Sequence, residues 1–260
     1  MEKIKVKIKV KEKNYDVFIG NNILSEMKDF ISQNHNGKRV VVITDNIVNK
    51  LHANKLAKTL KILNPFFISV QAGEVSKSRR TKEKIEDKLF DNKFGKDTVI
   101  IAFGGGVIGD LASFVASTFN RGIPIIHVPT TILAMADSSI GGKTSVNAKH
   151  GKNLIGTVYQ PAAVFTDMDF LGTLSIEEFR NGLAEIIKMS IIKDKNLFGL
   201  LTSFFSGFEG SAHSMCFFAS ISFMHSKIEF PNNSSNNISQ LVACDITEMS
   251  EMFFNLVANC

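Results

Sequence analysis

The sequence is poor in cysteine, and it has no long apolar run. Cys216, Cys244 and Cys260 form no disulfide framework, so we expect a reducing compartment, the cytoplasm. No apolar run reaches the roughly 18 residues that a membrane span needs. The first residues (MEKIKVKIKVKEK) alternate charged and apolar side chains, which is not the pattern of a signal peptide. These absences predict a protein with no membrane partner.

Charge of one sign is not concentrated anywhere along the chain. The net charge is +5 and the pI is about 9.0, but the lysines are scattered, which argues against a nucleic-acid partner. A mildly basic cleft suits a phosphorylated, acidic substrate equally well. With 260 residues, 44% of them hydrophobic and 21% charged, the chain is long enough for one large globular domain or two small ones.

Hydrophobic patterning predicts an α/β protein with a Rossmann-like, doubly wound parallel sheet. Short apolar runs alternate with helical patterns joined by short loops, the order that gives a parallel sheet. Asn22 is expected to cap the first helix, and Ser175 with Glu178 to form a capping box at a later one. Residues 132–160 lack a long periodic segment, so we expect a functional loop there. The strands are expected over 4–10, 15–19, 39–44, 66–70, 99–103, 123–128 and 164–167, and the helices over about 22–33, 48–61, 79–92 and 111–119.

A glycine-rich turn follows the buried strand that ends at Phe103. Strand, glycines and helix together place backbone N–H groups and a helix N-terminus against a phosphate, and a Cβ there would keep a pyrophosphate away. Gly104, Gly106 and Gly109 match G-x-G-x-x-G, yet the next strand ends in Pro129 rather than in the acidic residue of an ordinary Rossmann site. The alternative is a turn that only packs helix on strand.

Other polar residues follow the ends of strands. Asp45 is expected either to accept a hydrogen bond from a ribose or to cap a helix. Glu74 and Lys77 follow the next strand, where the alternative is the solvated start of a helix. The segment 132–160 adds several lysines, which suit a polyanionic ligand.

Residues from about 70 to 195 resemble 3-dehydroquinate synthase, and the wider family of sugar-phosphate cyclases shares much of the pattern. The resemblance implies an NAD-dependent, metal-assisted lyase of the shikimate pathway, which leads to aromatic amino acids. Such an enzyme cyclises 3-deoxy-arabino-heptulosonate 7-phosphate to dehydroquinate with loss of phosphate, and is a homodimer. The blocks that carry the resemblance are GEVSK (73–77), GGGVIGD (104–110), RGI (121–123), VPTT (128–131), DSSIGGKTSVN (137–147), GKNLIG (151–156), YQP (159–161), FLGTL (170–174) and GLAEIIK (182–188).

The resemblance also implies roles for individual residues. Glu185 matches the carboxylate that binds the zinc or cobalt ion; the alternative is a surface pair with Lys188. Residues that match positions near the substrate are Arg121, Asp137, Lys143, Lys152, Asn153 and Lys188. Residues that match positions near NAD are Asp45, Asn46, Glu74, Lys77, Gly105, Gly106, Val107, Ile108, Gly109, Asp110, Thr130, Thr131, Lys143, Lys152, Phe170, Leu171, Gly172 and Thr173.

The sequence departs from the family in two places. Ala72 stands where an Asp usually precedes the Gly-Glu pair, and the two metal histidines of the LNxGHTxGHA and HGEAV patterns are missing. We therefore expect an NAD-binding domain over 1–175, followed by an incomplete α-helical metal and substrate domain over 176–260 that is atypical after about 196. This truncated chain is expected to hold the metal weakly and to be inactive. The alternatives are a non-catalytic NAD-binding remnant, and another sugar-phosphate cyclase or polyol dehydrogenase.

Overall fold

The structure is a computed structural model that describes residues 4–8, 14–193 and 195–206. The chain divides into two compact units, Met1–Gly182 and Leu183–Cys260. The division falls inside the helix α5 (Ile176–Lys193), a few residues after the boundary expected from the sequence. The second unit also contains α6 (Lys195–Ser206).

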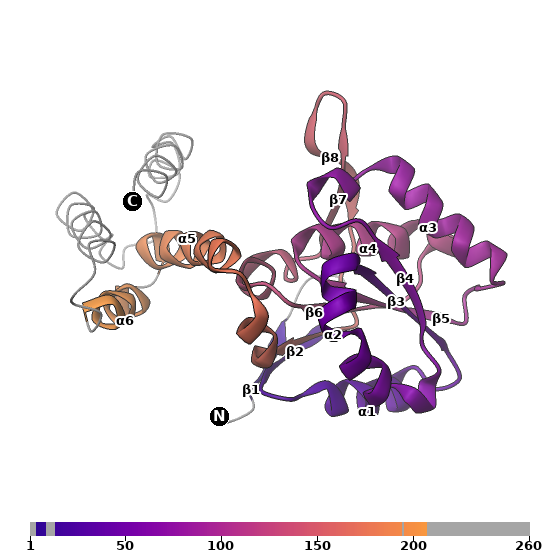
Figure 1. The fold of residues 1–260 in the computed structure, drawn as a ribbon, viewed down its shortest axis with the longest axis horizontal. Helices are drawn as coiled ribbons and strands as arrows, with labels where there is room; N and C mark the ends of the chain where they lie inside the picture. The colour runs from indigo at the N-terminus through magenta and orange to yellow at the C-terminus, as the bar shows by residue number, and fades with distance from the viewer. Residues whose placement is uncertain (1–3, 9–13, 194, 207–260) are drawn as a thin grey trace. The chain divides into compact units, whose positions relative to one another are not determined.

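The first unit alternates strands and helices along the chain, as Figure 1 shows. Short 3-10 turns and one π-helical turn, η1 to η5, connect these elements. The strands are β1 (Ile4–Ile8), β2 (Tyr15–Gly20), β3 (Arg39–Asp45), β4 (Phe66–Val70), β5 (Thr98–Gly104), β6 (Ile125–Pro129), β7 (Lys143–Ala148), β8 (Gly151–Val158) and β9 (Ala163–Asp167); the helices are α1 (Leu24–Asn34), α2 (Asn46–Thr59), α3 (Arg79–Asp91) and α4 (Gly106–Thr118).

Seven strands form one sheet in the order β1-β2-β9-β6-β5-β3-β4. Neighbouring strands from β2 to β4 run parallel, and only β1 is antiparallel, pairing with β2 at the edge. The predicted doubly wound parallel sheet is therefore confirmed. Because parallel strands all end at one edge, the segments that follow β3, β4, β5 and β6 gather there.

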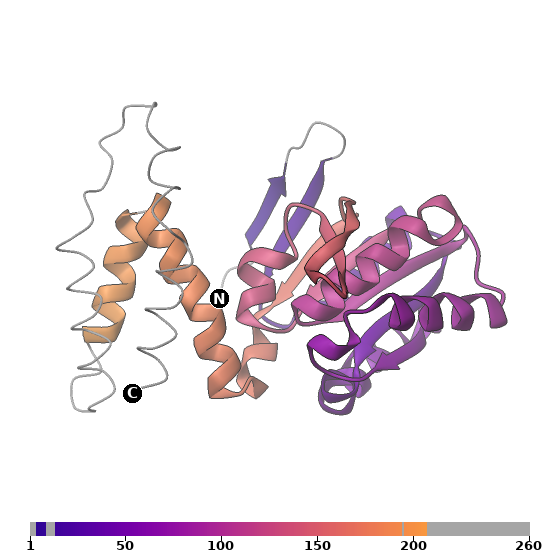
Figure 2. The ribbon, with the colours of Figure 1, turned by 90° about the horizontal axis from the view of Figure 1, so that it is seen from above.

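Helices cover both faces of the sheet, as the turned view in Figure 2 shows. Side chains alternate between the faces along β3: Val40 and Val42 face α1 and α2, whereas Val41 and Ile43 face α3 and α4. All four are buried. This burial on both faces explains why the strands are almost continuously apolar.

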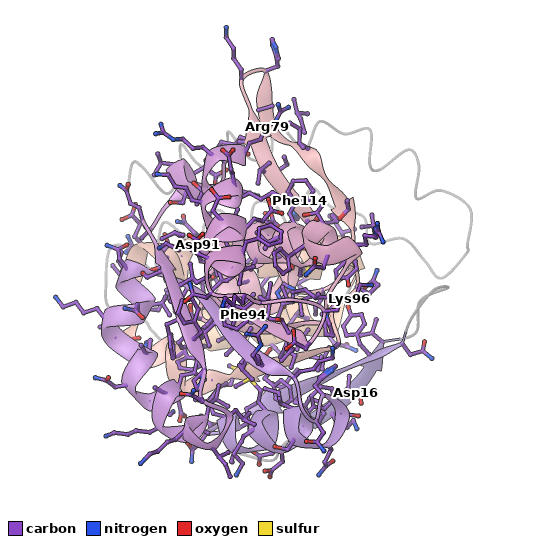
Figure 3. All side chains as sticks on the ribbon, turned by 90° about the vertical axis from the view of Figure 1, so that its right-hand side faces the viewer. Asp16, Arg79, Asp91, Phe94, Lys96 and Phe114 are labelled. Carbon is purple, nitrogen blue, oxygen red and sulfur yellow. The ribbon has the colours of Figure 1, made fainter. Side chains whose placement is uncertain are left out.

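Arg39 holds the amino edge of the sheet together. Its guanidinium forms an ion pair with Asp97 (Nε to Oδ2, 2.9 Å) and lies 4.5 Å from the centre of the Phe94 ring. Figure 3 labels Phe94 and Lys96 in this region; it also labels Arg79, the first residue of α3, which follows the bridge of Ser78 to Asn147 near the turn of the β7–β8 hairpin. These contacts anchor the edge of the sheet opposite to the one where ligands bind in such folds.

Two expectations about local structure were wrong. Asn22 does not cap α1, which begins after Ile23 without a side-chain cap. The cap comes from far along the chain: the buried Asp167 at the end of β9 accepts hydrogen bonds from the backbone N–H groups of Asn22 (2.9 Å) and Ile23 (3.2 Å). A long-range carboxylate thus replaces the local cap.

The second error concerns residues 132–160, which are not a loop throughout. They contain a π-helical turn, Ala134–Ser138, and the antiparallel hairpin of β7 and β8. Gly156 permits this pairing, because a Cβ there would lie 1.7 Å from the carbonyl oxygen of Thr144. Most residues of β8 are exposed, so the strand carries no apolar alternation from which the sequence could predict it.

Candidate functional site

The helix α4 starts directly after β5, in the glycine turn predicted from the sequence. Gly105 is its N-cap residue, and no side chain caps it. A Cβ on Gly105 would lie 3.1 Å from Thr131 Cγ2, and one on Gly106 would lie 3.0 Å from Ser138 Oγ. The glycines are thus required by close neighbours, and the uncapped first turn leaves N–H groups and a positive helix end for an anion.

Thr130 and Thr131 follow β6 beside this turn. The Thr130 N–H donates to the Gly104 carbonyl (3.0 Å), which ties the end of β6 to the end of β5. Thr131 Oγ1 accepts from the Ala134 N–H (3.2 Å). Thr130 is 5% exposed, and its hydroxyl finds no hydrogen-bond partner among the described residues. The structure therefore brings the threonines and the glycine turn together, as expected.

A partly buried polar cluster joins the loop after β4 to α4 and the hairpin. Lys77 forms an ion pair with Asp110, and its Nζ also donates to Asn153 Oδ1 (2.5 Å). Ser145 Oγ lies 3.2 Å from Asp110 Oδ2 and 3.0 Å from Asn153 Oδ1. Two donors, Lys77 and Ser145, and two acceptors, Asp110 and Asn153, thus form a closed ring of contacts, called the lysine ring below.

The pKa of Asp110 reflects opposing effects in this ring. Burial raises the pKa of its carboxyl, while the Lys77 ammonium and the Ser145 hydroxyl pull that pKa down. The nearby Glu74 carboxylate adds a smaller upward contribution. A carboxylate that is buried yet paired is typical of positions that bind ligands or orient other groups.

Asn147 holds the turn of the hairpin against the same loop. A register shift between Val146 and Ala148 marks a bulge in β7, and the Asn147 N–H donates to the Lys77 carbonyl (2.8 Å) instead. The Asn147 side chain donates to Glu74 Oε1 (2.7 Å) and accepts from the Asn153 N–H (2.9 Å). Asn147 therefore links Glu74, Lys77 and Asn153.

Asp45 and Asn46 make structural contacts at the end of β3. Asp45 Oδ1 accepts from the backbone N–H groups of Ile47 and Val48, both at 2.9 Å, so Asp45 is the N-cap of α2. Asn46 Oδ1 accepts from the Ala72 N–H (2.7 Å), which holds the loop after β4. The helix-cap alternative for Asp45 is confirmed, and its contact with a ribose stays a prediction.

The FLGT segment packs against α2. Phe170 is 2% exposed, and its ring belongs to the core, 5.3 Å from the Phe103 ring. Thr173 Oγ1 donates to the Phe170 carbonyl (3.1 Å) and lies 2.7 Å from His52 Nε2. Since the Thr173 hydrogen is used, His52 Nε2 must be the donor in the second bond. Leu171 is half-buried and Gly172 is exposed in the same turn.

The predicted substrate-binding residues Arg121, Asp137, Lys143 and Lys152 are all exposed. Arg121 precedes β6 at the amino edge of the sheet, next to Asn120, whose Nδ2 would lie 3.9 Å from a Cβ on Gly95, so the structure does not bring it to the α4 turn. Within the part of the chain that the structure describes, the side chains of Arg121, Asp137, Lys143 and Lys152 make no hydrogen bond or ion pair. Arg121 lies in left-handed backbone (φ 63°) between Asn120 (φ 48°) and Gly122 (φ 103°). Such a backbone conformation is uncommon for arginine, and residues in uncommon conformations cluster at functional sites.

Glu185 and Lys188 belong to the second unit and form an ion pair on α5. This pair is the alternative considered for them. No three His, Cys, Asp or Glu side chains gather as a metal site among residues 4–8, 14–193 and 195–206. The described residues therefore do not fit a metal ion, whereas the uncapped glycine turn does fit the pyrophosphate of NAD. His213 and His225, two further histidines of the sequence, lie outside the described residues.

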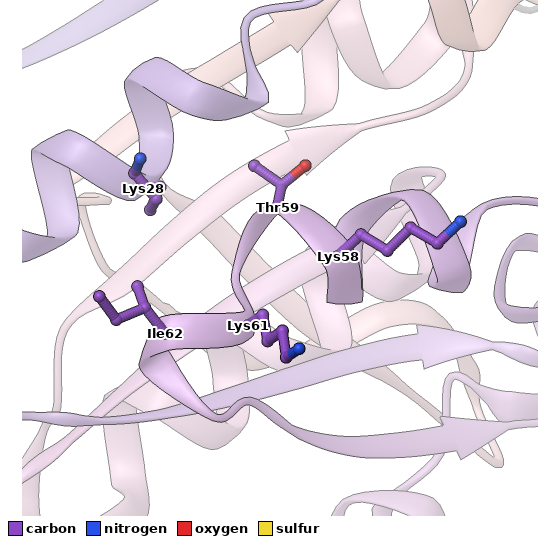
Figure 4. Close-up of a pocket in the computed structure, with 5 residues that line it drawn as sticks. All are labelled: Lys28, Lys58, Thr59, Lys61 and Ile62. Atoms are coloured by element: carbon purple, nitrogen blue, oxygen red, sulfur yellow. The ribbon is translucent and has the colours of Figure 1, made fainter.

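A basic pocket of about 500 Å³ lies away from these residues. It contains none of the predicted site residues, and Figure 4 shows the Lys58 side chain pointing away from Lys28 and Ile62. The lysines do not converge on one point, so the pocket forms no anion site. It is lined by Lys28, Lys58, Thr59, Lys61 and Ile62.

Sequence reasoning missed Ser145, Asn147 and His52 as parts of the site. Ser145 and Asn147 both lie in the DSSIGGKTSVN block that carries the resemblance, but neither was assigned a role there. His52 lies in the middle of a helix whose contact with the FLGT segment depends on the tertiary fold.

No helix in the described ranges is both long and apolar enough to cross a bilayer.

Comparison with known proteins identifies the family that shares these features. Residues 67–181 match the family model for the N-terminal part of 3-dehydroquinate synthase. Curated 3-dehydroquinate synthases from Pseudoalteromonas translucida and Campylobacter concisus are 43% and 44% identical over 76% and 77% of this chain. The chain covers 55% of each, and so spans about half the length of the curated relatives it matches.

Solved structures of related cyclases share the fold. A 2-deoxy-scyllo-inosose synthase, complexed with carbaglucose-6-phosphate, NAD⁺ and Co²⁺, is 28% identical with a TM-score of 0.68, covering 72% of this chain and 51% of that one. A 2-epi-5-epi-valiolone synthase from Streptomyces hygroscopicus, with NAD⁺ and Zn²⁺ bound, is 32% identical with a TM-score of 0.67, covering 75% and 54%.

Proposed function

We propose that this chain, which belongs to the 3-dehydroquinate synthase family over residues 67–181, binds NAD at the α4 turn and serves the cyclisation of 3-deoxy-arabino-heptulosonate 7-phosphate to dehydroquinate. The single observation that carries the proposal is the uncapped start of α4 at Gly105 and Gly106, directly beside the lysine ring. Relatives that share this fold bind NAD⁺ and a divalent metal in their own structures.

The residues of the first unit would divide the work of binding. The first-turn N–H groups of α4 would hold the pyrophosphate, because glycine lets it approach the backbone. Lys143 and Lys152 would bind the phosphate and carboxylate of the substrate, since their charges are unpaired within the described residues. Arg121, at the amino edge of the sheet, stays a predicted substrate residue without a place at this turn. Asp137 would orient a substrate hydroxyl. When bound, NAD supplies the reversible oxidation of that ring hydroxyl.

The remaining parts of the proposal concern the whole protein. Residues 1–175 would form the NAD-binding domain, and 176–260 part of a helical domain that carries Glu185 and Lys188. The protein would act in the cytoplasm on a phosphorylated keto acid, as a homodimer. No step is assigned to a metal, because the described residues offer it only the Glu185 carboxylate, which is paired with Lys188.

The proposal is tested by two measurements on the purified chain. Calorimetric titration with NAD should show saturable binding, and release of phosphate from 3-deoxy-arabino-heptulosonate 7-phosphate should then be measured at saturating NAD. Absence of NAD binding would contradict the proposal. Binding without phosphate release would favour the alternative, a non-catalytic NAD-binding remnant, and release only from other sugar phosphates would indicate another cyclase.

A further inference from the structure

We infer that Ser145 and Asn147 on β7 are positioning residues that hold Asn153 so that its side-chain NH₂ group, and not its carbonyl oxygen, faces a ligand. The inference rests on the proposed function for the nature of that ligand, an anionic oxygen. Neither Ser145 nor Asn147 was predicted from the sequence to belong to the site.

The hydrogen bonds of the lysine ring determine which end of the Asn153 amide points inward. Asn153 Oδ1 accepts from Lys77 Nζ (2.5 Å) and lies 3.0 Å from the Ser145 hydroxyl. The Lys77 ammonium can only donate, so the amide atom that faces it must be the oxygen. The single Ser145 hydrogen is shared between this oxygen and Asp110 Oδ2. The NH₂ group is on the other side of the amide plane and is turned away from the Lys77 ammonium.

Asn147 fixes the backbone that carries this side chain. Asn153 has a left-handed conformation (φ 59°), which is uncommon for residues other than glycine. The Asn147 Oδ1 accepts from the Asn153 N–H (2.9 Å) and thereby stabilises this turn. Ser145 and Asn147 lie on β7 on either side of the buried Val146, and both contact Asn153.

The exposed end of Asn153 is therefore a donor. Asn153 is exposed, and in the described part of the structure its Nδ2 makes no hydrogen bond. The preceding residue, Lys152, is also exposed. A free amide donor suits a phosphate or carboxylate oxygen and disfavours a cationic or donor group.

The first test uses the ligand-free chain. The pKa of the Asp110 carboxyl is measured by ¹³C NMR in the wild type, Ser145→Ala and Ser145→Thr. The Ser145 hydroxyl and the Lys77 ammonium both lower this pKa, and the nearby Glu74 carboxylate raises it. Loss of the hydroxyl should raise the pKa of Asp110 in Ser145→Ala, and Ser145→Thr should restore it. An unchanged titration in Ser145→Ala would overturn the role of Ser145.

The second test follows the side-chain NH₂ resonances of Asn153 in ¹⁵N–¹H spectra during titration with inorganic phosphate in the presence of NAD. The resonances should shift in the wild type, with phosphate affinity weakened about fivefold in Ser145→Ala and recovered in Ser145→Thr. Asn147→Ala should weaken it similarly, and Asn153→Asp should abolish it. If phosphate does not shift these resonances in the wild type, the inference is overturned. A failure of NAD to bind would count against the proposed function alone, because the titration of the ligand-free chain does not depend on NAD.

Discussion

Lys77 and Asp110 form an ion pair whose side chains are only 7% and 15% exposed. Taking two charges out of water costs free energy that their attraction and hydrogen bonds must offset, so removal of one partner leaves the other charge buried and unpaired. The structure shows that the two residues pair with each other, and their predicted contact with a cofactor stays a prediction.

We expect Asp110→Asn to lower the free energy of unfolding by about 3 kcal/mol, because Lys77 would be left as a buried, unpaired cation. The measurement is urea unfolding at neutral pH. The double variant Lys77→Met with Asp110→Asn should recover part of this loss, since it removes the unpaired charge. Equal stability of the wild type and Asp110→Asn would mean that the pair is solvated.

Gly106→Val should abolish NAD binding, because a branched side chain at the first residue of α4 blocks approach of the pyrophosphate to the backbone. A Cβ added at Gly106 would lie 3.0 Å from Ser138 Oγ. Because this close contact could also destabilise the fold, thermal unfolding is recorded to separate a loss of binding from a loss of folding. Gly199→Ala is the matched control, since a Cβ at Gly199 meets nothing within 4 Å. An NAD affinity in folded Gly106→Val equal to that of the control would contradict the site.

His127 should make the protein less stable as the pH falls. It is buried against Ser113 (Nε2 to Oγ, 2.9 Å), and burial lowers the pKa of His127 from 6.5 to about 4. Between these values the unfolded chain binds a proton that the folded chain does not, so stability is lost below pH 6.5, by about 3 kcal/mol on reaching pH 4. Urea unfolding over this pH range should show a shallower dependence in His127→Gln; identical slopes would refute the assignment.

Lys152→Ala should weaken phosphate binding in the presence of NAD while changing the free energy of unfolding by no more than about 0.5 kcal/mol. The reason is that Lys152 is exposed, and its ammonium pairs with no carboxylate within the described ranges. Lys149→Ala, another exposed lysine of the hairpin, is the matched control and should leave the affinity unchanged. If both variants bind phosphate as the wild type does, Lys152 is a surface residue.

The purified 260-residue chain should contain no stoichiometric zinc or cobalt. A catalytic zinc site needs three protein ligands; in the described part of the chain Glu185 is paired with Lys188, and no three His, Cys, Asp or Glu side chains gather there. Elemental analysis after gel filtration measures this directly. A tightly held ion that is lost in Glu185→Gln would show that residues outside the described ranges supply the missing ligands.

The repetitive part of the fold followed from local pattern. Strands such as Val99–Phe103 are buried on both faces, so every consecutive residue is apolar, and the run can be recognised in the sequence. The glycine turn was equally visible, since Gly105 and Gly106 must let other atoms approach closely. The hairpin was not, because the exposed β8 strand has no apolar face to reveal it.

For the site, the sequence alone predicted which types of polar residue take part, but not which of them contact each other. Lys77, Asp110 and Asn153 are distributed over 77 positions, and nothing in their local sequence says that they touch. The order of the strands and the bulge in β7 bring them together, and Ser145 completes the ring. Periodicity records whether a residue is buried, because burial depends on its near neighbours. Which buried polar groups meet depends on how distant segments pack, and only the tertiary structure decides that.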